Sequence, residues 1–400
     1  MKKRTIPRPL PIGELFAWAN DDEQAIAPER PQIVQPDVTE FGTDLNETLS
    51  ALAPEGSTLY AVGFDNTDGF LRAGYRVTDE KDADVVVARG GDAEFATAKR
   101  AAKKRLILCP THDYCATATD RYRTADKAFT VIKSGKKPDA VIIERASEIS
   151  PATIFGEIAT LELSAFDYAF GMLMRGEAVN DGLATDISAL VAGLTSKLKT
   201  HEKDEDYVRL ALADAGKTAA QAVESTPELA YASGATQVYE AMRMLCAHEA
   251  REIGARGEAE MLLAMYVTDY YIKTLGAKKP LFPPDNNKRI DRVCEYLGAD
   301  IIRSTVYVSP IYAPEKLKLC EYRCREFQSE LLRALAGLRE RLTAAFSVFK
   351  RLYPDDGYAL KSLIEPEDLR ICLALAPDVF AADSLLSLFK QQGVLENFLV

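Results

Sequence analysis

The chain has 400 residues, 47% of them apolar, which is enough for two ordinary domains with separate cores. Its formal net charge of −11 and the lack of a basic run interleaved with aromatics argue against a nucleic-acid partner. No uninterrupted apolar run of about 18 residues occurs, so we expect no membrane span. The basic start lacks the apolar stretch of a signal peptide, and seven scattered cysteines favour reduced thiols. We therefore expect a cytoplasmic protein.

The first segments indicate a leader followed by an α/β domain. Residues 1–55 are rich in Pro, Asp and Glu, with one predicted helix over 13–20, and we interpret them as a leader that partly docks on the domain behind it. Short apolar strands then alternate with helix-length polar stretches, which predicts a doubly wound, mainly parallel sheet over residues 56–150. The segments 129–132 and 141–143 resemble two strands around a turn. The predicted strands are 58–63, 83–89, 105–111, 128–133 and 140–144, with a helix over 93–104.

After residue 150 strands disappear and helical periodicity continues almost to the end. Ser150-Pro151 is a favourable helix start, with Ser as the cap and Pro at the first helical position, so we place the domain boundary there. The predicted fold is thus an α/β, nucleotide-binding-like domain followed by an all-α domain over 151–400. The predicted helices are 151–175, 186–198, 205–215, 236–253, 259–275, 287–297, 315–352, 366–375 and 384–392.

Gly90-Gly91-Asp92 is the first candidate site, because it stands between an apolar strand and a helix. Two glycines at such a turn let backbone N–H groups approach a pyrophosphate, which the helix N-terminus attracts. The alternative is an ordinary turn, and the Asp92 carboxylate favours that alternative because it would repel a phosphate.

Pro110-Thr111-His112-Asp113 is the second candidate, because it directly follows the strand at 105–109. Ligands of open α/β sheets bind beyond the carboxyl ends of the strands, which is where this loop lies. His112 beside Asp113 could perform acid–base chemistry, and the alternative is a solvated polar loop.

The helical region holds further candidates. His248 precedes Glu249 and Glu252 on one predicted helix, a pattern that fits either a metal site or an exposed pair. Cys320 and Cys324 lie four residues apart and fit either a redox pair or two core thiols. Glu157, Asp167, Gln237 and Arg256 belong to the motifs that carry the resemblance described next.

The order of these segments resembles the superfamily of glycerol-1-phosphate dehydrogenase, iron-containing alcohol dehydrogenase and 3-dehydroquinate synthase. The run from Gly90 to Lys99 resembles the family's Gly-Gly-Gly-x-x-x-Asp-x-x-Lys turn, and Pro110-Thr111 its Pro-Thr loop. Gly156-Glu157 with Asp167-Tyr168 resembles Gly-Asp…Asp-Trp. Residues 233–237 resemble Ser-Gly-x-Glu-His, and 256–258 resemble His-Gly-Glu. The resemblance spans residues 57–400, and it implies a dehydroquinate synthase-like fold that often forms homo-oligomers.

The resemblance implies NAD or NADP over the glycine turn, contacting Gly90, Gly91, Asp92, Pro110 and Thr111. It also implies one zinc or iron ion held by an Asp and two His. These ligand positions carry Glu157, Gln237 and Arg256 in this chain. A guanidinium has no lone pair to give a metal and an amide is a poor ligand, so the sequence predicts an altered metal site. In the turn itself, Asp92 replaces the third glycine and Ala96 the helical Asp.

Two functions follow as hypotheses. In the first, the chain is an NAD(P)-linked oxidoreductase of a small phosphorylated or polyhydroxy alcohol or ketone, with the Arg256 charge, paired with Glu157, in place of the metal. In the second, it is a non-catalytic homologue that serves as a binding, sensing or partner-subunit module. A dehydroquinate synthase-type lyase is a third and weaker reading, because it depends on the same ligands. No residue can be assigned to distinguish NAD from NADP.

Overall fold

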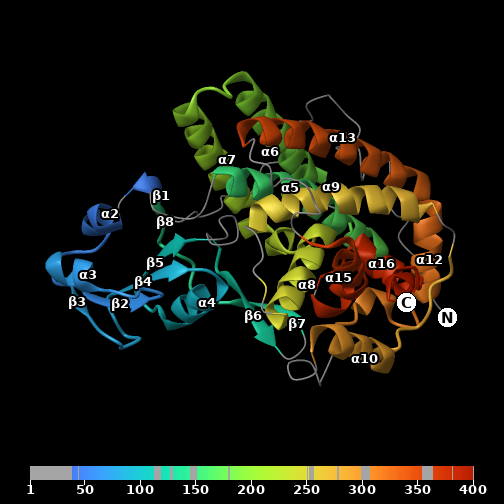
Figure 1. Ribbon diagram of the computed structural model, residues 1–400, viewed down its shortest axis with the longest axis horizontal. Helices are drawn as coiled ribbons and strands as arrows, with labels where there is room; N and C mark the ends of the chain where they lie inside the picture. The colour runs from blue at the N-terminus through green and yellow to red at the C-terminus, as the bar shows by residue number, and fades with distance from the viewer. Residues whose placement is uncertain are drawn as a thin grey trace, which may run out of the picture.

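The computed structural model describes residues 38–43, 45–111, 119–126, 129–144, 151–178, 181–249, 251, 256–276, 279–298, 307–353, 364–380 and 382–399. An α/β part, blue to teal in Figure 1, lies beside a larger helical part. No helix in these ranges is both long enough and apolar enough to cross a membrane.

The α/β part contains a sheet of six parallel strands in the order β1-β8-β5-β4-β2-β3. Three helices connect these strands and lie on both faces, so the sheet is doubly wound. The strands are β1 (Val38–Thr43), β2 (Thr58–Val62), β3 (Arg76–Val77), β4 (Val85–Gly90), β5 (Arg105–Pro110) and β8 (Ala140–Glu144). The helices are α2 (Leu45–Leu52), α3 (Asp68–Arg72) and α4 (Asp92–Ala101).

Strand β4 shows why these residues form a central strand. Val85 and Val87 point to the face covered by α2 and α3, whereas Val86 and Ala88 point to the face covered by α4. All four side chains are at most 3% exposed, as expected for a parallel strand buried on both faces. The carboxyl end of β4 thereby delivers Gly90 directly to the start of α4.

A two-stranded antiparallel hairpin lies beside the sheet, formed by β6 (Arg121–Asp126) and β7 (Phe129–Ser134). It contacts α4 on one side and the helical part on the other (Figure 1). We expected the strand at 128–133 to pair around a turn with that at 140–144. This pairing was wrong, because β7 pairs with β6 and β8 lies in the parallel sheet.

The helical part is built around α5 (Pro151–Arg175), which is buried along nearly its whole length and packs closely against α9 (Arg256–Leu275). Around this pair lie α6 (Asp181–Thr200), α7 (Glu205–Ser225), α8 (Gly234–His248), α10 (Asn286–Leu297), α12 (Leu317–Glu326), α13 (Gln328–Leu352), α15 (Pro366–Val379) and α16 (Leu385–Gln391). Short 3-10 turns are η2 (Pro227–Ala230), η3 (Pro310–Tyr312) and η4 (Leu395–Phe398).

The predicted fold class is confirmed: a parallel α/β sheet is followed by a helical region. The sheet starts earlier than expected, because residues 38–52, which we assigned to the leader, supply β1 and α2. The single helix predicted over 315–352 was also wrong, since it ends at Glu326 and restarts at Gln328. The predicted helix at 13–20 lies outside the described residues.

Candidate functional site

The glycine turn between β4 and α4 binds a carboxylate from its own helix. The backbone N–H of Gly91 donates to Oε2 of Glu94 at 3.1 Å. Gly90 has φ of 139°, and a Cβ placed there would lie 2.8 Å from Cγ of Glu94. A helix N-terminus attracts anions through its unpaired N–H groups. Here the Glu94 carboxylate takes up the donor that a pyrophosphate would need.

Asp92, the first residue of α4, begins a chain of ion pairs that joins the sheet to the helical part. Its carboxylate accepts from Arg123 of β6, at 3.1 Å from Nε and 3.0 Å from Nη2. Nη1 of Arg123 donates to Glu240 of α8 at 2.6 Å, and Arg243 donates to the other oxygen of Glu240 at 2.9 Å. The side chains of Arg123 and Glu240 are 6% and 1% exposed, so the central pair of this chain is out of water, whereas Asp92 and Arg243 at its two ends are 37% and 46% exposed.

The charges of this ion chain extend to the candidate residue Arg256. Burial opposes the Glu240 charge, but Arg123, Arg243 and Arg256 together hold the pKa of its carboxyl below the ordinary value. Burial, and then Glu240, raise the pKa of the neighbouring Tyr239 hydroxyl. The structure therefore brings the glycine turn and the helical motif at Arg256 into one electrostatic neighbourhood.

Glu157 and Arg256 flank the closest approach of α5 and α9. A Cβ on Gly156 would lie 2.0 Å from the carbonyl oxygen of Gly257, and one on Gly257 would lie 1.9 Å from that of Thr153. Any larger residue at either glycine would force the two helices apart. The adjacent Glu157 and Arg256 are each 5% exposed, so the two candidate residues occupy the same level of the buried helix pair.

Arg256 and Gln237 are engaged in contacts within the protein. Nε of Arg256 donates to Oε1 of Glu260 at 3.0 Å, and its Nη2 donates to the carbonyl of Ala230 at 3.3 Å. Gln237 donates through Nε2 to the carbonyl of Ala382 at 2.7 Å and accepts from Oγ of Ser384 at 2.5 Å. Glu260 is therefore one carboxylate partner of Arg256, and our pairing of Arg256 with Glu157 stays a prediction.

Asp167, the second acidic landmark of α5, is fully buried and joins two helix starts. Oδ2 accepts from the N–H of Gly234 at 2.8 Å and from the Tyr271 hydroxyl at 3.1 Å, while Oδ1 accepts from the N–H of Leu385 at 2.8 Å. Burial outweighs these hydrogen bonds and raises the pKa of Asp167 to about 7. Its contacts give Asp167 a structural role at the N-termini of α8 and α16.

The three positions that correspond to metal ligands do not fit a metal ion. Glu157 carries suitable donor atoms, but the amide oxygen of Gln237 already accepts from Ser384, and Arg256 has no lone pair to offer. Within the described ranges, no group of three or more His, Cys, Asp or Glu side chains is arranged to hold a metal. Glu252, the partner proposed for His248, lies outside those ranges.

The two cysteines of α12 lie in surroundings that raise the pKa of their thiols. Cys320 is 1% exposed and donates to the carbonyl of Ile311 at 3.4 Å. Burial raises the pKa of the Cys320 thiol, and burial followed by Cys320 raises that of Cys324 to about 11. Both are free cysteines whose packing fits core thiols better than redox chemistry.

Pro110 and Thr111 lie where the second candidate site was expected, at the carboxyl end of the sheet. Pro110 is in register with Gly90 in the neighbouring strand, and the N–H of Thr111 donates to the carbonyl of Gly90 at 3.0 Å. The glycine turn and the Pro-Thr loop are thus adjacent. His112 and Asp113 lie outside the described residues.

A cavity of about 180 Å³ lies at the same edge, lined by Asn46, Phe64, Asn66 and Arg89 among others. Arg89 forms a bidentate ion pair with Glu144 at 2.6 and 2.7 Å, and its guanidinium carbon lies 4.5 Å from the centre of the Phe64 ring. This cavity stands beyond the ends of β2 and β4, the position where open α/β sheets bind ligands.

Three residues that make the main polar contacts of the site were not predicted from the sequence: Glu94, Arg123 and Glu240. Glu94 could have been predicted. Gly91 is the N-cap of α4, and a Glu three positions after an N-cap residue is a common capping pattern. Arg123 and Glu240 are 117 positions apart, and no local pattern signals their pairing.

No protein-family model matches the chain, and no curated protein sequence matches it either. Among solved structures, an alcohol dehydrogenase from Oenococcus oeni is 12% identical with a TM-score of 0.47, covering 87% of this chain and 93% of that one. NADH-dependent butanol dehydrogenase A from Thermotoga maritima is 13% identical with a TM-score of 0.41, covering 88% and 100%. An iron-containing alcohol dehydrogenase from Corynebacterium glutamicum ATCC 13032 is 12% identical with a TM-score of 0.41, covering 89% and 98%. These values are too low to assign the chain to a family.

Proposed function

We propose that this chain is a non-catalytic, dehydrogenase-like protein that serves as a binding, sensing or partner-subunit module. The observation that carries this proposal is the Glu94 carboxylate, which accepts from Gly91 where a dinucleotide phosphate would need that donor. A second carboxylate, that of Asp92, stands on the same turn and is neutralised by Arg123. A dinucleotide would have to displace the Glu94 carboxylate from Gly91 and place its phosphates close to the Asp92 carboxylate.

The helical positions support the same proposal. Gln237 uses both ends of its amide to hold Ala382 and Ser384, and Arg256 is bound to Glu260 and Ala230. Moving either side chain toward a substrate would leave buried polar groups without partners, which costs about 1–3 kcal/mol for each group. The side chains of Gln237 and Arg256 are held by hydrogen bonds within the protein, so they are poorly placed to bind a substrate and its transition state.

A second candidate is the NAD(P)-linked oxidoreductase of a small phosphorylated or polyhydroxy alcohol or ketone, working without the usual metal. The cavity beside Arg89 favours it, because that space lies at the ligand-binding edge of the sheet. In this candidate the buried Arg256 guanidinium would polarise the substrate oxygen, with Glu157 as its partner.

Calorimetric titration of the full chain with NADH and NADPH, with zinc and then with a chelator, separates the two candidates. The non-catalytic proposal expects no saturable heat for either nucleotide at about 1 mM, near the weak end of useful affinities. Saturable binding that survives the chelator would contradict the blocked glycine turn on which the first proposal rests, and would favour the metal-free oxidoreductase. Binding that requires zinc would contradict both, because each assumes that Gln237 and Arg256 hold no metal.

A further inference from the structure

A separate cavity lies at the far end of α5 from Glu157. Its volume is about 140 Å³, and it is enclosed by the last turns of α5, by η2 and by the segment before α16. Its wall contains Tyr168, Arg175, Glu228, Tyr231, Tyr307 and Asp383. Its lining contains neither the glycine turn nor any of the three metal-ligand positions, and it adjoins the site described above through Ala382, whose carbonyl accepts from Gln237.

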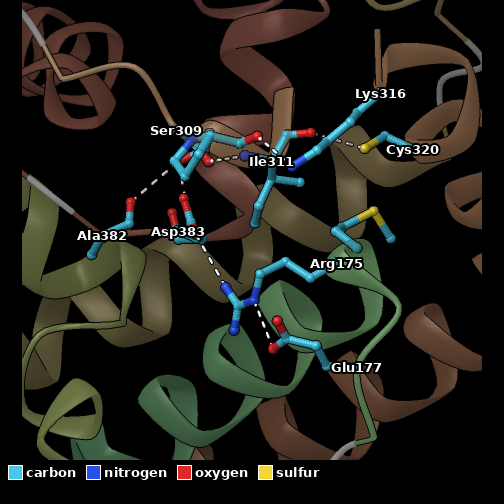
Figure 2. A network of polar contacts seen from close by, with 12 residues as sticks. Arg175, Glu177, Ser309, Ile311, Lys316, Cys320, Ala382 and Asp383 are labelled. Atoms are coloured by element: carbon cyan, nitrogen blue, oxygen red, sulfur yellow. Dashed lines mark hydrogen bonds and ion pairs between the residues drawn. The ribbon is translucent and has the colours of Figure 1, made fainter. Parts of the chain in front are cut away.

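Carboxylates outnumber cations around this cavity. Figure 2 shows the Arg175 guanidinium between Asp383 and Glu177, which it contacts at 3.3 and 2.8 Å. Glu228 adds a third carboxylate on the cavity wall. Burial, and then Glu228, raise the pKa of the Tyr168 hydroxyl. Glu177 contacts Arg175 from outside the lining, so the lining itself has two carboxylates, Glu228 and Asp383, and one guanidinium, which leaves an excess of one negative charge.

Aromatic rings form much of the remaining wall. The Tyr307 hydroxyl donates to Oδ1 of Asp383 at 3.3 Å, which fixes this ring beside the carboxylate. Burial, and then Asp383, raise the pKa of Tyr307, so the phenol stays neutral. Tyr168 reaches the cavity from α5. Tyr231 reaches it from the position that follows η2, and the guanidinium carbon of Arg123 lies 5.6 Å from the centre of its ring, so Tyr168 and Tyr307 are the rings left for a ligand. Neutral aromatic faces attract cations through their quadrupole, and desolvated sites strengthen that attraction.

We propose that this cavity binds a small organic ammonium ion. Tyrosine rings and an excess of carboxylates select a positive ligand over a neutral or anionic one of the same shape. At about 30 Å³ per water, the space holds roughly four to five water-sized groups, enough for an ammonium with a short alkyl chain. The inference goes beyond the proposed function and does not depend on its outcome, because the nucleotide titrations involve none of these residues.

The test is calorimetric titration of the full chain with choline and with ethanolamine at constant ionic strength. Choline carries a quaternary ammonium and ethanolamine a primary ammonium, so their relative affinities show which of these two cations the cavity prefers. The neutral control is 3,3-dimethyl-1-butanol, which has the shape of choline without its charge. We expect at least one ammonium probe to bind saturably below about 10 mM and the neutral alcohol to bind at least about tenfold more weakly. Equal binding of choline and the alcohol, or no saturable heat with either ammonium, would overturn the proposal.

Two variants and a matched control locate the binding. Glu228→Gln removes an exposed carboxylate of the wall, and Tyr168→Leu removes a half-buried ring; each should weaken the bound ammonium about fivefold or more. Glu202→Gln makes the same charge change at a distant ion pair with Arg351 and should leave affinity unchanged. Thermal unfolding of each variant confirms that it is folded. Equal weakening by Glu228→Gln and Glu202→Gln would show general charge attraction and would contradict a built site.

Discussion

The turn at residues 90–92 and the helical positions Glu157, Gln237 and Arg256 are embedded in the fold in different ways. At the turn, the partner of Gly91 is Glu94, three residues further along the same helix. At Gln237 the partners are Ala382 and Ser384, 145 and 147 residues away. The Gly91–Glu94 contact lies within one helix end, whereas the contacts of Gln237 join two segments that are far apart in the sequence.

This difference has consequences for substitution. A capping contact such as that of Glu94 is typically worth about 1 kcal/mol, so it can be removed with the fold intact. A buried, long-range polar contact leaves its partners unsatisfied when it is lost, and the whole helical part responds. The turn is therefore the place where ligand binding can be changed, and the helical positions are where stability is at stake.

The largest expected effect concerns the ion chain between the two regions. Arg123→Ala removes the cation that lies 2.6 Å from the buried Glu240 carboxylate. Breaking a buried pair by removing one partner costs about 3–5 kcal/mol. Because Arg243 still donates to the other oxygen of Glu240, we expect a loss at the lower end of this range, about 3 kcal/mol in the free energy of unfolding, measured in urea.

Arg339→Ala is the control for Arg123→Ala, because its pair with Asp269 is exposed and should contribute less than about 1 kcal/mol. Equal effects of the two substitutions would mean that the ion chain does not couple the sheet to the helical part.

Asp167 gives a pH dependence to the helical region. Its folded pKa of about 7 lies above its ordinary value of 3.8, so the folded state binds the proton more tightly. The contribution of Asp167 to stability is fully present below about pH 4, is lost as pH rises from about 4 to about 7, and changes no further above that. The loss is on the order of 1–4 kcal/mol.

Urea denaturation of the wild type and Asp167→Asn across this pH range isolates the Asp167 contribution. Asp383, whose pKa is also raised by burial, contributes equally to both proteins. The free energy of unfolding of the wild type, relative to that of Asp167→Asn, should fall steadily as pH rises from about 4 to about 7. A difference that is constant with pH would show that Asp167 is charged throughout.

Gln237→Ala tests the helical positions directly. The change leaves the carbonyl of Ala382 and the hydroxyl of Ser384 without this partner. We expect a loss of about 2 kcal/mol in the free energy of unfolding. The matched control, Gln328→Ala, removes a single amide contact to the carbonyl of Leu275 in a part-buried setting and should cost less. A smaller loss at Gln237 than at Gln328 would contradict a structural role for the first.

The sequence predicted elements whose signals are local. The runs at 85–88 and 140–143 are apolar and β-rich, and the predicted helix over 151–175 has the observed bounds of α5, with Pro151 as its start signal. Strand β6 was missed because Arg121, Arg123 and Asp126 give it a polar, charged composition. The break at Phe327 has neither Gly nor Pro to mark it. Strand β1 at residues 38–43 was not predicted, because the acidic and proline-rich residues around it led us to assign the whole segment to a leader.

The site was predictable only as far as its backbone landmarks. The resemblance placed Gly90 and Pro110 in one cofactor site, and the structure has the two residues in register on adjacent strands. The close approach of Gly156 and Gly257 was not predicted. The partners of the side chains could not be read from the sequence, because Arg123–Glu240 and Gln237–Ser384 form only once the chain has folded. The sequence showed that Gln237 and Arg256 are poor metal ligands, but it did not show which groups these two side chains contact.

Calorimetric titration of NADH into Glu94→Ala, Glu94→Gln and wild type shows whether the Glu94 carboxylate occupies the glycine turn and keeps a dinucleotide out. Glu94→Ala frees the Gly91 donor and removes a negative charge, at a stability cost of about 1 kcal/mol. The control Glu94→Gln removes the charge and keeps an acceptor for Gly91. The account predicts that Glu94→Ala binds NADH at least about tenfold more tightly than wild type, with Glu94→Gln between them. Equal NADH affinity in all three proteins, with saturable binding in wild type, would contradict it.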